Sequence, residues 1–436
     1  MGNIEPAFCG RSFDCGIGAA VAHSAGKTRK YHLLEGCFQM RIPKRNFFSQ
    51  GLILLVFSGF LFSSYTLCWP GSETGGNTPT GDVLLCRQAS YAQSAALIAG
   101  IRSPQSTLAP FESGPVWTEF AKSFDHDWGK YDKMHLAPMR KWAAGELPES
   151  LSSGFTIFYP FSGPDFVNPY TVFPGAGTYI LMALEPVGEV PDFQAMSRTE
   201  LDSFFADIRK SLHDLLSIDY FISSHMHTGM EGKELNGVLP FLLFFMAREK
   251  TRILDVEYWF MEPDGTIQKV PGFESGKPGP PGAIPGVRIV FESAGSPGNK
   301  PQTLYYFRLN LHNRTFRSNS HFITFLQNFG PLITFMKSAA YVMCDPKASA
   351  ARQFVLDQSR YVLQEDSGIP FRYFDPSVWA LQFYGTYSAP ISIFKHEYQA
   401  DLARIYKTGR DVKPLPFGIG YHFQVDTANL MFATKK

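Results

Sequence analysis

The sequence carries little net charge and few tryptophans. Lys and Arg number 40 against 39 Asp and Glu, which gives a formal net charge of +1. A nucleic-acid-binding surface usually brings a clear positive excess, so no nucleic-acid partner is expected. Only 6 residues are Trp, whereas 40 are Phe. Because Phe has no polar group, we assign the aromatic excess to core packing rather than to a sugar-binding surface.

Complete catalytic motifs are also missing from the sequence. It has no G-x-S-x-G nucleophile elbow, no H-E-x-x-H zinc motif and no repeat of fixed period. Its hydrophobic content of 44% and charged content of 18% are nevertheless enough for a sizeable core, which excludes a disordered chain. The sequence therefore indicates fold class and compartment, and leaves open whether the protein is an enzyme.

A basic segment precedes an apolar run near the N-terminus. The basic residues are Arg41, Lys44 and Arg45. The run over 52–62, with its apolar continuation to 69, is typical of an export signal, or of a membrane anchor at 52–69 if it stays uncleaved. Lipidation at Cys68 is a third possibility, although the residues before it are not small. We expect an exported bacterial protein of the cell envelope, either periplasmic or anchored in the inner membrane.

Composition divides the chain into four segments. They are 1–39, which we interpret as a mis-called extension upstream of Met40; 40–69, the export signal or anchor; 70–90, a Gly/Ser/Thr/Pro-rich linker; and 91–436, a single large α/β domain. In an oxidising compartment Cys86 could form a disulfide with Cys344. A free, buried Cys344 is an equally good interpretation.

Alternating strand and helix patterns in 91–436 predict an α/β fold. Residues 155–161 and 177–188 are almost entirely apolar, as in strands covered on both faces. Ser197 and Glu200 form a capping box before a long amphipathic helix. Another helix is predicted over 348–364. We therefore predict a mixed, largely covered sheet with flanking helices, a Rossmann-like three-layer core and added hairpins; an α+β arrangement is the alternative.

The turn SGPD after the first predicted strand supplies candidate catalytic residues. Ser162 and Asp165 stand at the carboxyl end of that strand, and Glu185 stands late in the next one. Ligands of doubly wound sheets lie at such strand ends. The arrangement resembles class I methyltransferase-like folds, which hold a nucleoside there, but the G-x-G loop is missing. The resemblance implies such a fold without its cofactor; capping of the next helix by Asp165 is the alternative.

A histidine pair suggests a metal site. His225 and His227 in SHMHTGM resemble the start of the H-x-H-x-D-H motif of metallo-β-lactamase-type hydrolases. Gly229 and Met230 replace the last two ligands of that motif. A catalytic zinc needs three protein ligands and a water molecule. A divalent metal bound by the pair, in an exported hydrolase, is therefore one hypothesis, and a polar turn with ordinary histidines is the other.

Two adjacent carboxylates, Glu365 and Asp366, follow the predicted helix over 348–364. Such a pair can act as acid and base if its pKa values are split, but at an exposed helix end it is usually solvated. The phrases FYPFSGPDF, LEPVG and LQEDSGIP resemble uncharacterised exported bacterial proteins, which implies export and no particular activity. Our leading hypothesis is a binding or structural protein of the cell envelope with an unknown ligand.

Overall fold

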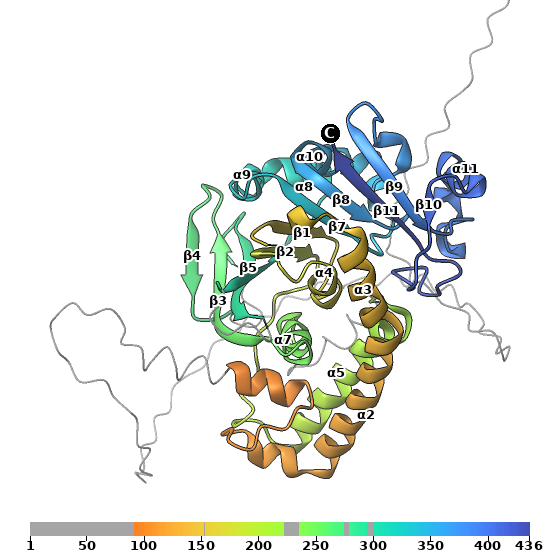
Figure 1. Cartoon of the computed structure of the whole chain (residues 1–436). Coiled ribbons are helices and arrows are strands. Elements are labelled where there is room, and N and C mark those ends of the chain that lie inside the picture. Colours follow the sequence, from red (N-terminus) through yellow and green to blue (C-terminus); the bar gives the residue numbers. More distant parts are fainter. Residues whose placement is uncertain (1–90, 152, 222–234, 274–278, 294–299) are drawn as a thin grey trace, which may run out of the picture. The chain divides into compact units, whose positions relative to one another are not determined.

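The computed structural model describes residues 91–436, apart from 152, 222–234, 274–278 and 294–299. In this part of the chain, eleven strands join in one mixed sheet, in the order β10-β9-β11-β8-β7-β1-β2-β6-β5-β3-β4 (Figure 1). The strands are β1 (Thr156–Pro160), β2 (Thr178–Ala183), β3 (Arg252–Met261), β4 (Ile267–Val270), β5 (Ile284–Glu292), β6 (Gln302–Arg308), β7 (Leu332–Met336), β8 (Ser359–Gln364), β9 (Trp379–Gly385), β10 (Val412–Lys413) and β11 (Asn429–Lys435). The predicted α/β class is therefore confirmed.

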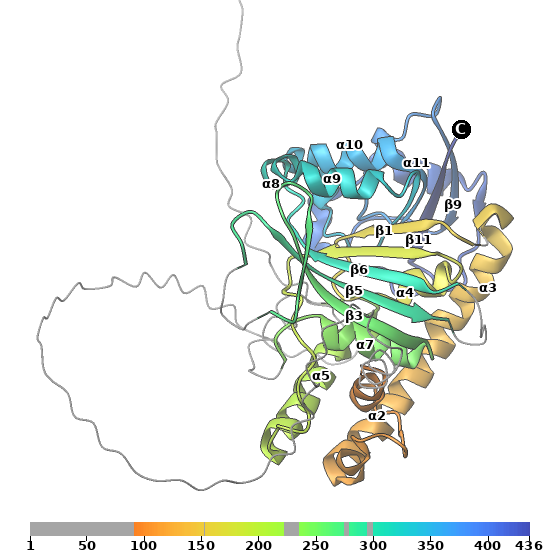
Figure 2. The same ribbon diagram turned by 90° about the vertical axis from the view of Figure 1, so that its left-hand side faces the viewer.

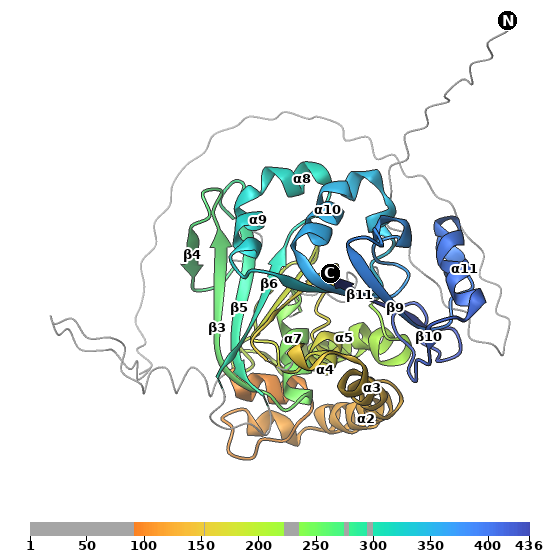
Figure 3. The same ribbon diagram turned by 45° about the horizontal axis from the view of Figure 1, so that its top comes forward.

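Helices cover both faces of the sheet (Figure 2). One face carries α2 (Pro115–Tyr131), α3 (Ala137–Glu146), α4 (Val167–Val172), α5 (Arg198–Ile218) and α7 (Leu239–Arg248). The other face carries α8 (Asn313–Ser318), α9 (Ser320–Gln327) and α10 (Ser349–Gln358), and α11 (Ala400–Thr408) lies beside β9 and β10 (Figure 3). Among the residues described, no helix is both long enough and apolar enough to cross a bilayer.

Two hydrophobic clusters, one on each face, explain why the central strands read as continuous apolar runs. In β1, Tyr159 belongs to the cluster under α2–α7, whereas Phe158 belongs to the cluster under α8–α11. In β2, Leu181 and Ile180 divide in the same way. Successive side chains of a strand point to opposite faces, so a strand buried on both faces needs apolar residues at every position.

The order and direction of the central strands place a topological switch point between β1 and β7. On one side of β1 lie β2 and then β6, both parallel to it, with β5, β3 and β4 beyond β6; the chain later builds β7 and β8, also parallel, on the other side of β1. Strand β11 inserts antiparallel between β8 and β9. Loops that leave the carboxyl ends of β1 and β7 therefore diverge, and ligands of open α/β sheets bind at such a point.

Two predicted boundaries are wrong. The helix expected over 348–364 ends at Gln358, and Ser359–Gln364 form β8, because Tyr361, Val362 and Leu363 pack into the sheet between β7 and β11. The strand expected over 177–188 ends at Ala183. Three residues later Pro186 has no N–H to donate to a neighbouring strand. Strand pairing therefore ends although the apolar sequence continues.

Candidate functional site

The switch point is filled by side chains that follow β1 and β7. Asp165 follows β1 after a tight turn, and Lys337 is the first residue after β7. The Lys337 Nζ lies 2.9 Å from the Asp165 Oδ2 and 3.3 Å from the Oδ1 of Asp219, the residue that ends α5. The three side chains are 2%, 2% and 0% exposed. We call Asp165, Asp219 and Lys337 the ion-pair cluster.

Asp165 also bonds to the helix that follows it, although the N-cap residue of α4 is Phe166 and makes no side-chain cap hydrogen bond. Its Oδ1 accepts the backbone N–H of Asn168 at 3.2 Å, in the first turn of α4. The Asn168 side-chain amide donates to the same carboxylate at 3.0 Å. These bonds alone would leave a buried carboxylate without a counter-charge, whereas Lys337 supplies one. Asp165 therefore fixes the start of α4 and one end of the ion-pair cluster together.

Two tyrosine hydroxyls complete the acceptor sites of these carboxylates. The Tyr159 hydroxyl donates to Asp165 Oδ2 at 3.0 Å, and the Tyr131 hydroxyl donates to Asp219 Oδ1 at 2.5 Å. The backbone N–H of Gly420 donates to Asp219 Oδ2 at 2.8 Å. Burial, followed by the adjacent carboxylates, raises the pKa of both tyrosines well above the usual value, so both stay protonated donors.

Opposing effects act on the ammonium of Lys337. Burial lowers the pKa of a lysine, but attraction to Asp165 and Asp219, with their hydrogen bonds, outweighs burial and raises the pKa of Lys337. The ammonium also donates to the backbone carbonyl of Asp219. Lys337 is therefore held in its cationic form in this cluster, which disfavours nucleophilic or base chemistry at its Nζ.

A π-helical turn, Asp132–Leu136, joins α2 to α3 and follows Tyr131 directly. The N–H of Ala137 bonds to the carbonyl of Asp132, five residues back. Pro138 has no N–H for the normal helical bond to Met134, and its ring would crowd that carbonyl. The helix therefore widens before the proline. Such π turns are frequent at functional sites, and this one, which we call the π turn, lies one residue from the Tyr131–Asp219 contact.

A second group of buried polar residues follows β8. Glu365 and Asp366 are only 1% and 3% exposed, so the expectation of a solvated helix end is wrong. Asp366 accepts hydrogen bonds from the Tyr341 hydroxyl at 2.5 Å and from the Asn429 amide at 2.9 Å. The His422 Nε2 lies 3.3 Å from its Oδ1, a contact with ion-pair distance but without hydrogen-bond alignment. We call Glu365 and Asp366 the carboxylate pair.

The two members of the carboxylate pair differ in protonation. Burial, and then repulsion from Asp366, raises the pKa of Glu365 well above its usual range. Burial acts on Asp366 in the same direction, but His422, Asn429 and Tyr341 stabilise its charged form and lower its pKa. Two adjacent buried carboxylates rarely both carry charge, so one proton stays on Glu365 and the negative charge on Asp366.

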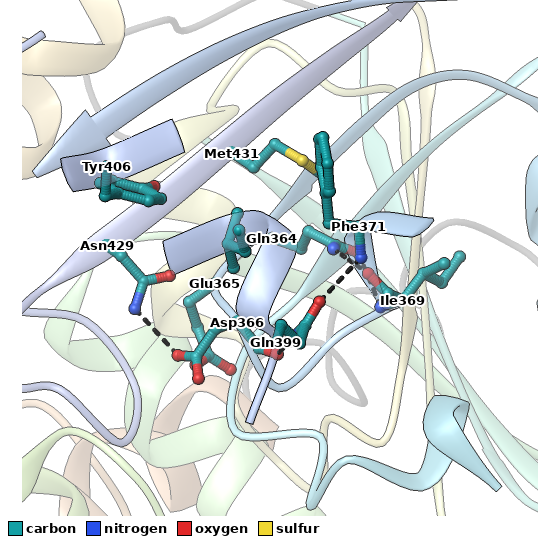
Figure 4. Close-up of a pocket in the computed structure, with 10 residues that line it drawn as sticks. Gln364, Glu365, Asp366, Ile369, Phe371, Gln399, Tyr406, Asn429 and Met431 are labelled. Atoms are coloured by element: carbon teal, nitrogen blue, oxygen red, sulfur yellow. Dashed lines mark hydrogen bonds between the residues drawn. The ribbon is translucent and has the colours of Figure 1, made fainter. Parts of the chain in front are cut away.

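A small cavity lies beside the carboxylate pair (Figure 4). Its volume of about 10 Å³ suits one water molecule. The polar residues that line it include Gln364, Gln399 and Asn429. Gln364 bonds to both backbone groups of Ile369 and therefore closes the loop after β8. This cavity is too small for an organic substrate.

Backbone strain is concentrated around the two groups. Seven non-glycine residues of the described chain have positive φ, and five of them lie here: Phe161, Asp219, Ser338, Ala340 and Tyr341. Phe161 begins the turn after β1, and the last three lie in the loop after β7. Each such conformation costs about 1–3 kcal/mol and persists only where the surroundings enforce it. Strain of this kind gathers at functional sites, which favours this edge of the sheet as the working region.

Ser162 and Glu185 both lie beyond strand ends: Ser162 is two residues past β1, and Glu185, expected inside the second strand, is two residues past β2. The Ser162 Oγ accepts the N–H of Met182 at 3.1 Å, and the Ser162 N–H donates to the Met182 carbonyl at 3.1 Å. Ser162 thus extends the β1–β2 ladder and is buried. Glu185 lies two residues beyond β2 and is half-buried.

Other sequence predictions fall on residues outside the described chain. His225 and His227 lie in 222–234, and Cys86 lies before residue 91. Cys344 is half-buried and has no disulfide partner among the described residues, and burial raises the pKa of its thiol to about 12. Within the described residues, no three His, Cys, Asp or Glu side chains form a group that could hold a metal ion. The metal and disulfide hypotheses therefore stay predictions.

No protein-family model, curated protein or solved structure matches this chain. Function is therefore argued from the site alone. The residues that sequence reasoning missed are Lys337, Asp219 and Tyr131. Lys337 directly follows the apolar run LITFM, and a lysine at the end of a buried strand is a signal that could have found it.

Proposed function

We propose that this chain is a ligand-binding protein whose site lies at the carboxyl ends of β1 and β2, and that its ligand is a small molecule rich in hydroxyl groups, such as a nucleoside or a sugar. The observation that carries the proposal is the position of Glu185, just past β2 and next to the switch point. A carboxylate at the end of the second strand is well placed to accept hydrogen bonds from two hydroxyls.

The sheet supports this reading. If the seven strands β1, β2, β6, β7, β8, β9 and β11 are numbered along the chain, their spatial order is 3-2-1-4-5-7-6, with the seventh antiparallel. This order resembles that of class I methyltransferase-like folds, in which the second strand ends in an acidic residue that holds a ribose. Because the resemblance is one of topology, it supports the location of the site and does not identify the ligand.

The ion-pair cluster argues against methyl transfer. Lys337 and Asp165 fill the switch point with a buried ion pair, and no G-x-G loop follows β1. Pro164 is buried in that turn and removes one backbone N–H. We therefore propose binding without the usual cofactor.

The proposed surface is open at two neighbouring positions. A Cβ added to Gly163 would meet nothing within 4 Å, and Leu184 is 48% exposed. The Ser162–Met182 bonds hold these two tips side by side. The Arg308 Nε donates to the Leu184 carbonyl at 3.0 Å and the Tyr306 hydroxyl donates to the Glu185 carbonyl at 2.8 Å, so the backbone of the tip is fixed. The two tips therefore offer an exposed apolar side chain beside Glu185.

Titration calorimetry of the full chain with adenosine, ribose and a panel of neutral sugars tests the proposal. At least one compound is expected to bind, and Glu185→Gln is expected to weaken it by about tenfold or more, because charge-assisted hydrogen bonds contribute roughly 1.5–3 kcal/mol. Glu292→Gln is the matched control, since Glu292 ends β5 at the opposite edge of the sheet. Absence of binding across the panel, or equal affinity of Glu185→Gln, would contradict this function.

Acid–base catalysis by the carboxylate pair is a second candidate function, and it requires the loop after β8 to open for a substrate, because the adjacent cavity holds only one water molecule. The opposite pKa shifts of Glu365 and Asp366 favour it, because an enzyme acid and its partner base need different protonation states in one site. A hydrolase that uses His225 and His227 is a separate hypothesis that rests on residues outside the described chain.

We also propose that the protein acts in the cell envelope after export. The support is the basic segment before the apolar run at 52–62 and the linker composition of 70–90. In a bacterial host, alkaline phosphatase fused after residue 90 is expected to be active, because that enzyme folds with disulfides only outside the cytoplasm. The control is alkaline phosphatase fused to residues 91–436, which lack this segment. Equal activity of the two fusions would refute export by this segment.

A further inference from the structure

A largely buried carboxylate, that of Glu249, lies at the end of α7, away from the edge of the sheet where β1, β2 and β7 end. Glu249 follows the last residue of α7, and its side chain is 12% exposed. Its Oε2 lies 4.0 Å from the Nη1 of Arg140 on α3. The other terminal nitrogen of Arg140 donates to Asp132, the first residue of the π turn. Arg140 therefore faces two carboxylates and binds one of them closely.

The surroundings of Glu249 disfavour a negative charge. The end of a helix presents unpaired carbonyls and a partial negative charge, which repel a carboxylate. The charged groups that face Glu249 are Arg140, Asp132 and Lys250, and their effects partly cancel. Burial is the largest influence and raises the pKa of Glu249 from 4.5 to about 7. Proton loss thus falls in the neutral range.

We propose that Glu249 is a proton-operated switch that acts through Arg140 on the packing of the π turn. When Glu249 is protonated, Arg140 bonds to Asp132 alone and holds the π turn against α3. In the ionised form, Glu249 attracts Arg140 and competes with Asp132 for it. The π turn then loosens, and with it the position of Tyr131, whose hydroxyl supports Asp219 in the ion-pair cluster. Ionisation of Glu249 at neutral pH would thereby affect the ion-pair cluster at the carboxyl ends of β1 and β7, through contacts that run from Arg140 to the π turn and Tyr131.

Hydrogen exchange followed by mass spectrometry tests the switch on the full chain. The exchange rates are first corrected for the intrinsic pH dependence of exchange. Peptides that cover 131–140 are then expected to exchange about tenfold faster at pH 8.5 than at pH 5.5, if ionisation of Glu249 changes the opening equilibrium of the π turn by the equivalent of roughly one pKa unit. In Glu249→Gln the corrected rates should be equal at the two pH values. Glu146→Gln is the control: Glu146 ends α3, the helix of Arg140, and pairs with Lys413, so this variant should behave as the wild type.

Arg140→Gln separates the switch from a merely local effect. Glu249 would still titrate in this variant, but its proton would no longer reach the π turn, so exchange in 131–140 should lose its pH dependence. The folding stability of the wild type relative to Glu249→Gln should fall as pH rises from about 4.5 to about 7, because the folded-state pKa is raised. A pH dependence of exchange that persists in Glu249→Gln would overturn the proposal.

Discussion

Replacing Lys337 by methionine is expected to lower the free energy of unfolding by about 3–5 kcal/mol at pH 7, the usual cost of removing one partner of a buried ion pair. Lys337, Asp165 and Asp219 are together almost fully buried. Methionine keeps much of the side-chain volume and removes the charge. Two carboxylates would then face each other with only hydroxyl, amide and backbone donors. Chemical denaturation followed by circular dichroism measures the change.

A triple variant, Lys337→Met with Asp165→Asn and Asp219→Asn, shows whether charge is the cause. It should recover most of the lost stability, because asparagine can still accept the Asn168 N–H at the start of α4 and tolerates the left-handed backbone at position 219. Isosteric replacement of a whole buried ion pair is often close to neutral. The exposed pair of Lys413 and Glu146 is the matched control, and Lys413→Met should cost less than about 1 kcal/mol. If Lys337→Met also lowered the free energy of unfolding by less than about 1 kcal/mol, the buried ion pair would not stabilise the fold as we expect.

The parts of the fold that the sequence predicts correctly have local causes. The capping box of Ser197 and Glu200 is present, with Ser197 N–H to Glu200 Oε2 at 2.7 Å and Glu200 N–H to Ser197 Oγ at 3.3 Å, and α5 starts there. The apolar runs at β1 and β2 are buried on both faces, which the sequence expresses as a lack of alternation. Short-range patterns of this kind are legible without knowledge of the fold.

The site was less legible because its contacts are long-range. Lys337 and Asp219 are 118 residues apart and meet only because β7 and α5 converge at the switch point. No spacing rule relates them. The error at Glu365 had a different cause: helical periodicity in 349–358 was extended into 359–364, where the same apolar residues belong to β8. A carboxylate pair predicted at an exposed helix end is in fact at the buried end of a central strand.

The two residues of the carboxylate pair should differ in how much their substitution lowers stability, and the larger effect is expected at Asp366. Asp366→Asn is expected to lower the free energy of unfolding by about 2–4 kcal/mol, because the Tyr341 hydroxyl and the Asn429 amide both lose a charged acceptor. Glu365→Gln is expected to cost less than Asp366→Asn, since Glu365 is already neutral, and the cost comes from the N–H groups of Ser338 and Ser367, of which glutamine can accept only one. Asp426→Asn, on an exposed part of the chain before β11, is the control.

The pH dependence of the two variants should differ in sign. The pKa of Asp366 is lowered, so its stabilisation is present above the unfolded-state pKa and is lost as pH falls through the folded-state value. The pKa of Glu365 is raised, so its contribution is present at low pH and is lost as pH rises through the folded-state value. Asp366→Asn should therefore flatten the acid side of the stability curve, and Glu365→Gln the alkaline side.

The same variants decide whether the pair does chemistry. If the second candidate function holds, a screen with ester and glycoside substrates should find an activity that both substitutions abolish, since one removes the acid and the other the base. If the pair is only structural, an activity found in the wild type would survive Glu365→Gln, whose fold is expected to be intact. Equal and large losses of stability in both variants would contradict the assignment of different protonation states to the two carboxylates.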